Sequence, residues 1–465
     1  MKFIKEAYEI VKEEGLDPFP TIVEFVDSEE MLEIVAKGGF KKRYSHWTFG
    51  MEYENIKKSE KYGLSKIYEI VINNDPCYAY FKKTGSEMLN KIIAVHVLAH
   101  SDFFKNNIWF SQTNRRMIHR MENSEKIVNK YIEKYGLETV ENFINSVLSL
   151  DYFIDYHSMF IKRKKEKVFF DKEKVKEKEI QTKKLDLKPY MEPFINLKPK
   201  KEKKSKKEKQ FEPEKDILYF LIKNAPLEDW ERNIMEIIRE DCYYFAPQRL
   251  TKIMNEGWAA YWHSKLASKF LESKDMIEYC DFHSKILGGG MMNPYKLGFE
   301  LFKYIEDCWN KGKFGVEYAK CEDMQKKSNW DLKLNKGKEK IFEVRKTNID
   351  LTFIDNFFTE EFFKNNPFYL LGFIGNVLVE IKDFKEIKKI LLKKLENMGM
   401  PVIKVVDDNW ENRKELYLKH EHDGRDLYLD VARKALENIF KMWKRTVHLE
   451  TKISGKTKIL TAPEK

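Results

Sequence analysis

The sequence of 465 residues has few cysteines, and no two of them stand close together. An odd number of scattered cysteines without a Cys-x-x-Cys pair is typical of reduced, mostly buried thiols in a cytosolic protein. The composition therefore argues against a disulfide framework and against a zinc ribbon. The cysteines are Cys77, Cys242, Cys280, Cys308 and Cys321.

Long apolar runs are missing as well. No stretch approaches the roughly 18 apolar residues that a membrane-spanning helix needs. Residues 1–14 alternate Lys and Glu with apolar residues, unlike the ordered regions of a signal peptide. We therefore expect a cytoplasmic protein without a membrane span.

A recognisable nucleic-acid-binding module is also absent, although the formal net charge is +10 at pH 7. Residues 198–209 alone hold eight Lys and two Glu, which leaves only +4 for the rest of the chain. Such a composition cannot bury enough apolar surface to fold. We interpret residues 162–215 as a solvated Lys/Glu-rich linker or insertion, partly helical near 163–179, and do not expect nucleic acid as a partner.

The hydrophobic content of the whole chain, 42%, is sufficient for a large core. Helical periodicity dominates on both sides of the linker, whereas the last hundred residues mix strands with helices. We predict a mainly α core with a small C-terminal α+β domain, with the core halves at 1–161 and 216–364 and the domain at 365–465. The predicted core helices are 2–14, 28–36, 66–72, 88–104, 115–135, 140–148, 216–224, 228–244, 251–271, 273–286 and 296–311. The C-terminal strands are 369–375, 377–381, 402–406, 416–420 and 447–451, with helices at 384–397 and 429–443.

Two histidines, His96 and His100, stand four residues apart inside the apolar run 94–104. On a helix this spacing places both imidazoles on one face, so that both can reach one metal ion. Neutral imidazoles inside a core need hydrogen bonds or a metal to offset their burial. Packing remains the alternative, and Asp102 either orients His100 or ends the helix.

The aromatic segment 255–263 supplies a carboxylate, Glu256, and another imidazole, His263. Seven residues separate them by about 10.5 Å along a helix, so at most one can bind an ion held by the histidine pair. We assign Glu256 as the third metal ligand, Glu240 as base or second ligand, and His263 as an outer or substrate contact. The ion would be zinc or another divalent metal.

Several alternatives weigh against a site. Glu240 and Glu256 can each pair with a buried arginine or cap a helix. The zincin protease template is not matched, because Val97 occupies the position of its glutamate. A di-iron bundle needs Glu-x-x-His twice, and no histidine here follows a glutamate at that distance. We interpret His283, which shares a helical face with Cys280, as a packing residue, and Trp258, Tyr261 and Trp262 as core or, alternatively, as a stacking wall.

Long ordered phrases stand out over most of residues 20–160 and 215–360. Besides both candidate ligand segments, they include Tyr44-Ser45-His46-Trp47-Thr48-Phe49-Gly50-Met51-Glu52-Tyr53, Tyr62-Gly63-Leu64-Ser65-Lys66-Ile67-Tyr68-Glu69, Asn74-Asp75-Pro76-Cys77-Tyr78-Ala79-Tyr80, Ala225-Pro226-Leu227-Glu228-Asp229-Trp230 and Asn293-Pro294-Tyr295-Lys296-Leu297-Gly298. These phrases resemble the SpoVR family, named after a stage V sporulation protein. The resemblance implies a cytosolic protein of spore cortex formation, related to proteins of bacteria without spores, and gives no established activity. It also implies a stress or sporulation pathway shared with a kinase-like AAA+ protein and a von Willebrand A-type protein.

Two classes of function fit these features. The first is a metal-dependent hydrolase or amidase of the sporulation pathway, with His96, His100 and Glu256 holding the ion. The second is a non-enzymatic regulator or scaffold, in which the C-terminal domain docks a partner. Loss of metal on replacing His96 would support the first, and an unaffected His100→Ala variant the second.

Overall fold

The structure is a computed structural model and describes residues 2–62, 67–83, 86–160, 212–288, 292–374 and 377–463. Most of the predicted linker, with its expected helix near 163–179, lies outside the described residues. The elements before that segment are α1 (Lys2–Glu13), β1 (Thr21–Val26), α2 (Ser28–Ala36), α3 (Trp47–Lys61), β2 (Glu69–Ile72), β3 (Cys77–Lys82), α4 (Glu87–Asn106), η1 (Ile108–Phe110), α5 (Met117–Tyr135), α6 (Leu137–Leu148) and η2 (Tyr156–Phe160).

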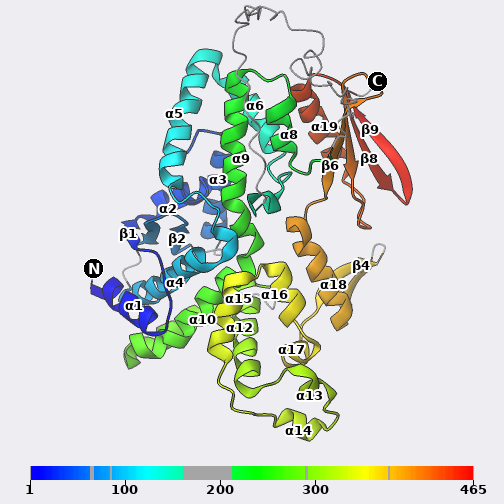
Figure 1. Ribbon diagram of the computed structural model, residues 1–465. Coiled ribbons are helices and arrows are strands. Elements are labelled where there is room, and N and C mark those ends of the chain that lie inside the picture. The colour runs from blue at the N-terminus through cyan, green and yellow to red at the C-terminus, as the bar shows by residue number, and fades with distance from the viewer. Residues whose placement is uncertain are drawn as a thin grey trace, which may run out of the picture.

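After the linker, helices follow one another up to residue 365, and a mixed α/β segment then closes the chain (Figure 1). The helices are α8 (Ile217–Asn224), α9 (Asp229–Leu250), α10 (Lys252–Phe270), η3 (Ser273–Asp275), α11 (Met276–Ile286), α12 (Pro294–Lys311), α13 (Gly315–Lys320), α14 (Met324–Ser328), α15 (Gly337–Thr347), α16 (Asp350–Phe357) and α17 (Glu360–Asn365). The closing elements are β4 (Leu370–Ile374), β5 (Val377–Ile381), α18 (Phe384–Leu395), η4 (Glu396–Gly399), β6 (Ile403–Trp410), β7 (Glu415–His420), α19 (Leu429–Trp443), β8 (Val447–Ile453) and β9 (Lys456–Ala462).

The predicted fold class is confirmed: a mainly helical core carries a C-terminal unit of four strands and a helix. In that unit the sheet order is β6-β7-β8-β9, and α19 packs on it. The hairpin β4-β5 and α18 lie elsewhere, because Phe384 of α18 stacks on Phe358 of the helical core. Within the described residues, no helix is long and apolar enough to cross a bilayer.

A small three-stranded sheet in the first half was missed by the helical prediction. β3 is central, with β1 parallel and β2 antiparallel to it. The predicted helix at 66–72 is wrong over its described part, because Ile70, Val71 and Ile72 pair with β3. β-branched side chains favour this pleated, half-buried setting over a helix.

The main core lies where α4 from the first half packs against α10 from the second, and α10 in turn packs against α12. Helix α4 begins at Ser86, whose side chain accepts a hydrogen bond from the backbone of Leu89, and it is apolar on nearly every face. The second core joins α6, α8 and α9 to the C-terminal sheet. Figure 1 shows α4 lying beside α10 in the main core. Each of these two cores therefore needs residues from both halves of the chain.

Helices α10 and α12 approach each other unusually closely. They meet at two glycines, and a Cβ atom on Gly257 would lie 2.4 Å from the Gly298 backbone. Asn255 and Glu256 directly precede Gly257 on α10, and Tyr295 lies in the first turn of α12, three residues before Gly298. The glycine contact therefore fixes how these side chains face α4.

Candidate metal centre

Helix α4 places His96 and His100 against each other in the core. Their Nε2 atoms lie 3.0 Å apart, and the two residues are only 3% and 7% exposed. The ring planes stand nearly perpendicular, at 84°. Two imidazole nitrogens thus point at one place, as the four-residue spacing predicts.

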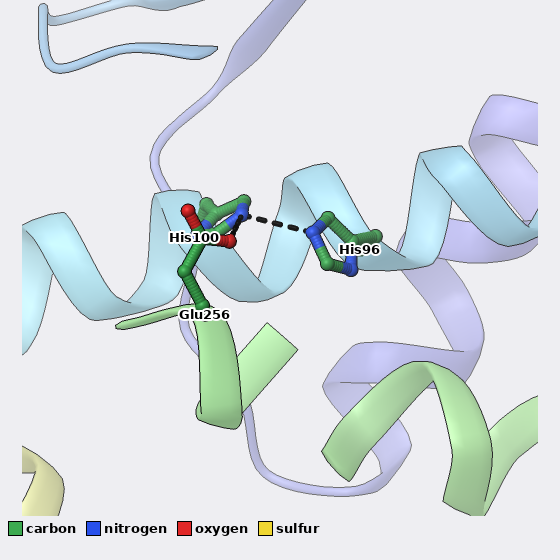
Figure 2. A group of neighbouring side chains, drawn as sticks. All are labelled: His96, His100 and Glu256. Atoms are coloured by element: carbon green, nitrogen blue, oxygen red, sulfur yellow. Dashed lines mark hydrogen bonds and ion pairs between the residues drawn. The ribbon is translucent and has the colours of Figure 1, made fainter. Parts of the chain in front are cut away.

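Glu256 reaches this place from α10, as Figure 2 shows. Its Oε2 lies 3.5 Å from Nε2 of His100, and one donor atom from each of Glu256, His96 and His100 lies within 4.8 Å of the others. The same oxygen is buried and accepts no hydrogen bond from any described residue. A buried carboxylate oxygen without a donor is costly, and a cation would satisfy it. This donor set fits a divalent ion such as zinc.

A second carboxyl group, Glu69 of β2, lies beside the same nitrogens. Its Oε1 is 3.6 Å from Nε2 of His96. Burial and the nearby charge of Glu256 raise the pKa of Glu69 to about 8. The sequence prediction missed this residue because its segment was assigned to a helix, although Glu69 ends one of the family-like phrases.

Tyr295 of α12 also lies against the cluster. Its ring stacks on His96 with centroids 6.2 Å apart. The charge of Glu256, then burial, raise the pKa of the Tyr295 hydroxyl well above its usual value. The tyrosine therefore stays protonated beside the carboxylates.

Asn255, the residue before Glu256 on α10, orients the imidazole of His100. It contacts the outer ring nitrogen, Nδ1, which is the one not beside His96. Nδ1 of His100 lies 2.9 Å from Oδ1 of Asn255, and an amide oxygen can only accept a hydrogen bond. Nδ1 therefore carries the hydrogen, which leaves a lone pair on Nε2 facing Glu256. This arrangement of an outer partner and a free inner nitrogen is typical of metal-binding histidines.

On its other ring nitrogen, His96 contacts His263, which in turn contacts His283. Nδ1 of His96 lies 2.9 Å from Nδ1 of His263, whose Nε2 in turn lies 3.1 Å from Nδ1 of His283. Burial, followed by the neighbouring imidazoles, lowers the pKa of His96 well below its usual value and that of His263 to about 3. At neutral pH both rings are uncharged, as metal ligation requires.

This row of histidines corrects one interpretation of the sequence. His283 is not a simple packing partner of Cys280, because it contacts His263 and so supports the site. His263 itself is fully buried. It contacts Nδ1 of His96, whereas Nε2 of His96 is the nitrogen that lies beside His100. His263 therefore lies next to His96 and outside the group formed by His96, His100 and Glu256.

Glu240 does not join the cluster. It pairs with Arg120, accepts a hydrogen bond from Asn114 at 2.9 Å, and lines a different cavity. Its assignment as base or second ligand is therefore replaced by Glu69. The sequence could not reveal this, because Glu240 lies on α9, ten residues before that helix ends, whereas Glu256 lies on the separate helix α10.

The remaining candidates have structural roles. Asp102 does not orient His100, because it binds Arg345 at 3.2 Å and the indole of Trp258 at 2.9 Å. Trp258, Tyr261 and Trp262 are buried in the main core and form no stacking wall. They fix α10 against α4 and so hold Glu256 in place.

A cavity of about 560 Å³ opens onto the cluster. Its wall includes His100, Glu256, Glu69, Asn255 and Tyr295. This volume is within the range of small-molecule sites. A substrate of modest size could therefore reach the carboxylates and the His100 side of the cluster.

Comparison with known families agrees with the phrases in the sequence. A family model described as SpoVR like protein matches residues 1–400, and a model described as SpoVR-like C-terminal domain matches residues 401–454. This chain belongs to the SpoVR family. All residues of the candidate site lie within the first of these two matches.

A relative of this SpoVR chain is Uncharacterized protein YcgB of Escherichia coli (strain K12), which is 29% identical over 331 residues. The match covers 65% of this chain and 62% of that protein. No solved structure matches the chain.

Replacing Glu69 with glutamine is expected to change how the stability of this SpoVR protein depends on pH. Because the folded-state pKa of about 8 lies above the ordinary 4.5, the folded chain keeps a proton that the unfolded chain loses between these values. The stabilisation that the protonated Glu69 gives to the folded state is complete below pH 4.5 and is lost as the pH rises through 8. In urea unfolding of EDTA-treated protein, the wild type should lose more unfolding free energy than Glu69→Gln between about pH 6 and about pH 9. Parallel profiles for the two proteins would contradict the burial of this carboxyl group.

Proposed function

We propose that this SpoVR-family chain is a metal-dependent hydrolase or amidase whose single divalent ion, zinc in the first instance, binds to His96, His100 and Glu256. One observation carries the proposal: donor atoms from two distant segments converge within 4.8 Å at the wall of a cavity. Three protein ligands and one open position are typical of catalytic rather than structural zinc sites.

The ion would act as a Lewis acid and lower the pKa of a bound water toward neutrality. Glu69 lies where it could accept a proton from such a water, because its Oε1 is 3.6 Å from the inner nitrogen of His96. A nearby dication would lower the pKa of Glu69 from about 8 and leave it ionised for this role. Tyr295 would supply a hydroxyl donor, while Asn255 and His263 hold the two imidazoles.

The family suggests the biological setting of this reaction. We place the activity in sporulation, at spore cortex formation, in the cytoplasm. A peptide or peptidoglycan precursor would be the substrate. A kinase-like AAA+ protein and a von Willebrand A-type protein of the same pathway are the proposed partners. The support for this setting is membership of the SpoVR family.

Metal analysis tests the proposal directly. The full chain, purified without chelator or metal-affinity resin, should contain close to one equivalent of metal by mass spectrometry. After EDTA treatment and dialysis, it should take up one equivalent of zinc and regain hydrolysis of short peptide amides. A preparation that neither retains nor takes up stoichiometric metal would refute the site, and metal binding without hydrolysis would refute the enzyme.

A regulatory or scaffold function is the second candidate, and the surface of α19 favours it. Tyr428 and Val431 are 87% and 68% exposed there, and two apolar side chains three residues apart at the start of one helix would suit a partner surface. Deleting the C-terminal unit cannot decide between the two functions, because its sheet shares a core with α6, α8 and α9. The His100→Ala variant decides: restored sporulation in a null strain would favour the regulator.

A further inference from the structure

The cavity beside the metal centre is also lined by positive charges that the proposed chemistry does not use. Arg43, Arg249 and Lys252 contribute to its wall together with Gln248. Three cations around one cavity are a feature of sites for anionic ligands.

Arg43 is a fixed charge. Its guanidinium lies over the rings of Phe49 and Phe245, at 4.9 and 5.5 Å from their centroids. It donates to Asp241 at 2.9 Å, and its side chain is only 11% exposed. Aromatic contacts and an ion pair thus hold this guanidinium rigidly at the cavity wall.

Arg249 is held in the same manner at the end of α9. It lies 4.2 Å from the centroid of the Tyr152 ring and forms an ion pair with Asp151 at 3.2 Å. A guanidinium carries five N–H donors, so one carboxylate leaves several available for a ligand. The side chain is 32% exposed, which keeps it accessible from the cavity.

Lys252 carries the third positive charge at the cavity wall. It is exposed at the first residue of α10, and within the described residues its side chain forms no ion pair. Glu256 follows four residues later on the same face of the helix, about 6 Å away. An anion held by Lys252 would therefore lie one helical turn from the candidate metal ligand.

We propose that Arg43, Arg249 and Lys252 form an oxyanion-binding subsite for a carboxylate or phosphate group of the substrate. The bound anion would place the neighbouring amide bond at the His/Glu cluster. The placement of the amide bond at the cluster rests on the proposed function, whereas the anion subsite does not. The substrate class is therefore a small molecule or short peptide that carries an acidic group near the bond to be cleaved.

Calorimetric titration of the EDTA-treated full chain tests the subsite without any metal. The probes are inorganic phosphate and glutarate, which represent the two sources of an oxyanion. At least one should bind at a single site, and Lys252→Gln and Arg249→Gln should each weaken that binding about fivefold or more. The control is Lys269→Gln, which removes an exposed charge from the far end of the same helix and should leave binding unchanged.

The outcomes separate the two proposals. Tighter phosphate binding assigns a phosphorylated substrate, and tighter glutarate binding assigns a carboxylate. No binding of either probe, or equal binding by the wild type and the Lys252 and Arg249 variants, overturns the subsite. Anion binding by a chain that takes up no metal would uphold the subsite and refute the hydrolase.

Discussion

Replacing His100 with alanine is expected to lower the affinity for zinc by more than about 100-fold. Loss of an outer partner of a metal-binding histidine already costs about 10- to 100-fold, and His100 is itself one of the three donors. Its Nε2 lies 3.0 Å from that of His96 and 3.5 Å from Glu256. Competition titration with a fluorescent zinc chelator would measure the change.

Two further variants make this expectation specific. Glu256→Gln keeps the side-chain volume and removes the charge, so it should lose zinc without a large loss of stability. Asn255→Ala should weaken zinc binding by about 10- to 100-fold, because it frees only the outer nitrogen of His100. His119→Ala is the control, since His119 is 79% exposed on α5 and should leave affinity unchanged. Wild-type affinity in Glu256→Gln would contradict the ligand set.

Replacing Gly298 with alanine is expected to destabilise the folded chain by about 3 kcal/mol or more. The new Cβ would lie 2.1 Å from the carbonyl oxygen of Ile253 and 2.7 Å from Cα of Gly257. These are backbone atoms, which cannot rotate away as a side chain can. Helices α10 and α12 would have to separate and open the main core between them.

Differential scanning calorimetry would detect this as a lowered melting temperature. Gly50→Ala provides the matched control, because a Cβ at this position in α3 meets nothing within 4 Å. That variant should be stabilised by about 0.5–1 kcal/mol, since alanine is the better helix former. An unchanged melting temperature in Gly298→Ala would contradict the close packing of the two helices. The same variant should bind zinc more weakly, because the candidate ligand Glu256 directly precedes Gly257 at the displaced contact.

Much of the fold and part of the site followed from local sequence signals. The helices at 28–36 and 429–443 have the predicted bounds, because periodicity and flanking breakers are properties of a single segment. His96 and His100 followed from their spacing on a helix. Glu256 was proposed as the carboxylate of the aromatic segment 255–263, although no local rule shows that its helix packs against α4.

The remainder of the site depends on contacts between distant segments. Glu69 was assigned to the wrong element, since a four-residue strand gives only a weak pattern until β3 pairs with it. His283 appeared isolated because its partner, His263, lies 20 residues away on another helix. Glu240 was a candidate carboxylate for base or second ligand, whereas the break between α9 and α10 separates it from Glu256.

The separation of the two ligand helices along the chain has a consequence for synthesis. His96 leaves the ribosome 167 residues before His263, an interval of roughly 10 to 30 s at about 5–20 residues per second. Helix α1 and the three-stranded sheet can cover part of α4 early, but the apolar face that packs against α10 stays uncovered until α10 arrives. In a growing chain, the helix that carries His96 and His100 thus exposes an apolar face to solvent. We expect it to recruit a holding chaperone during translation.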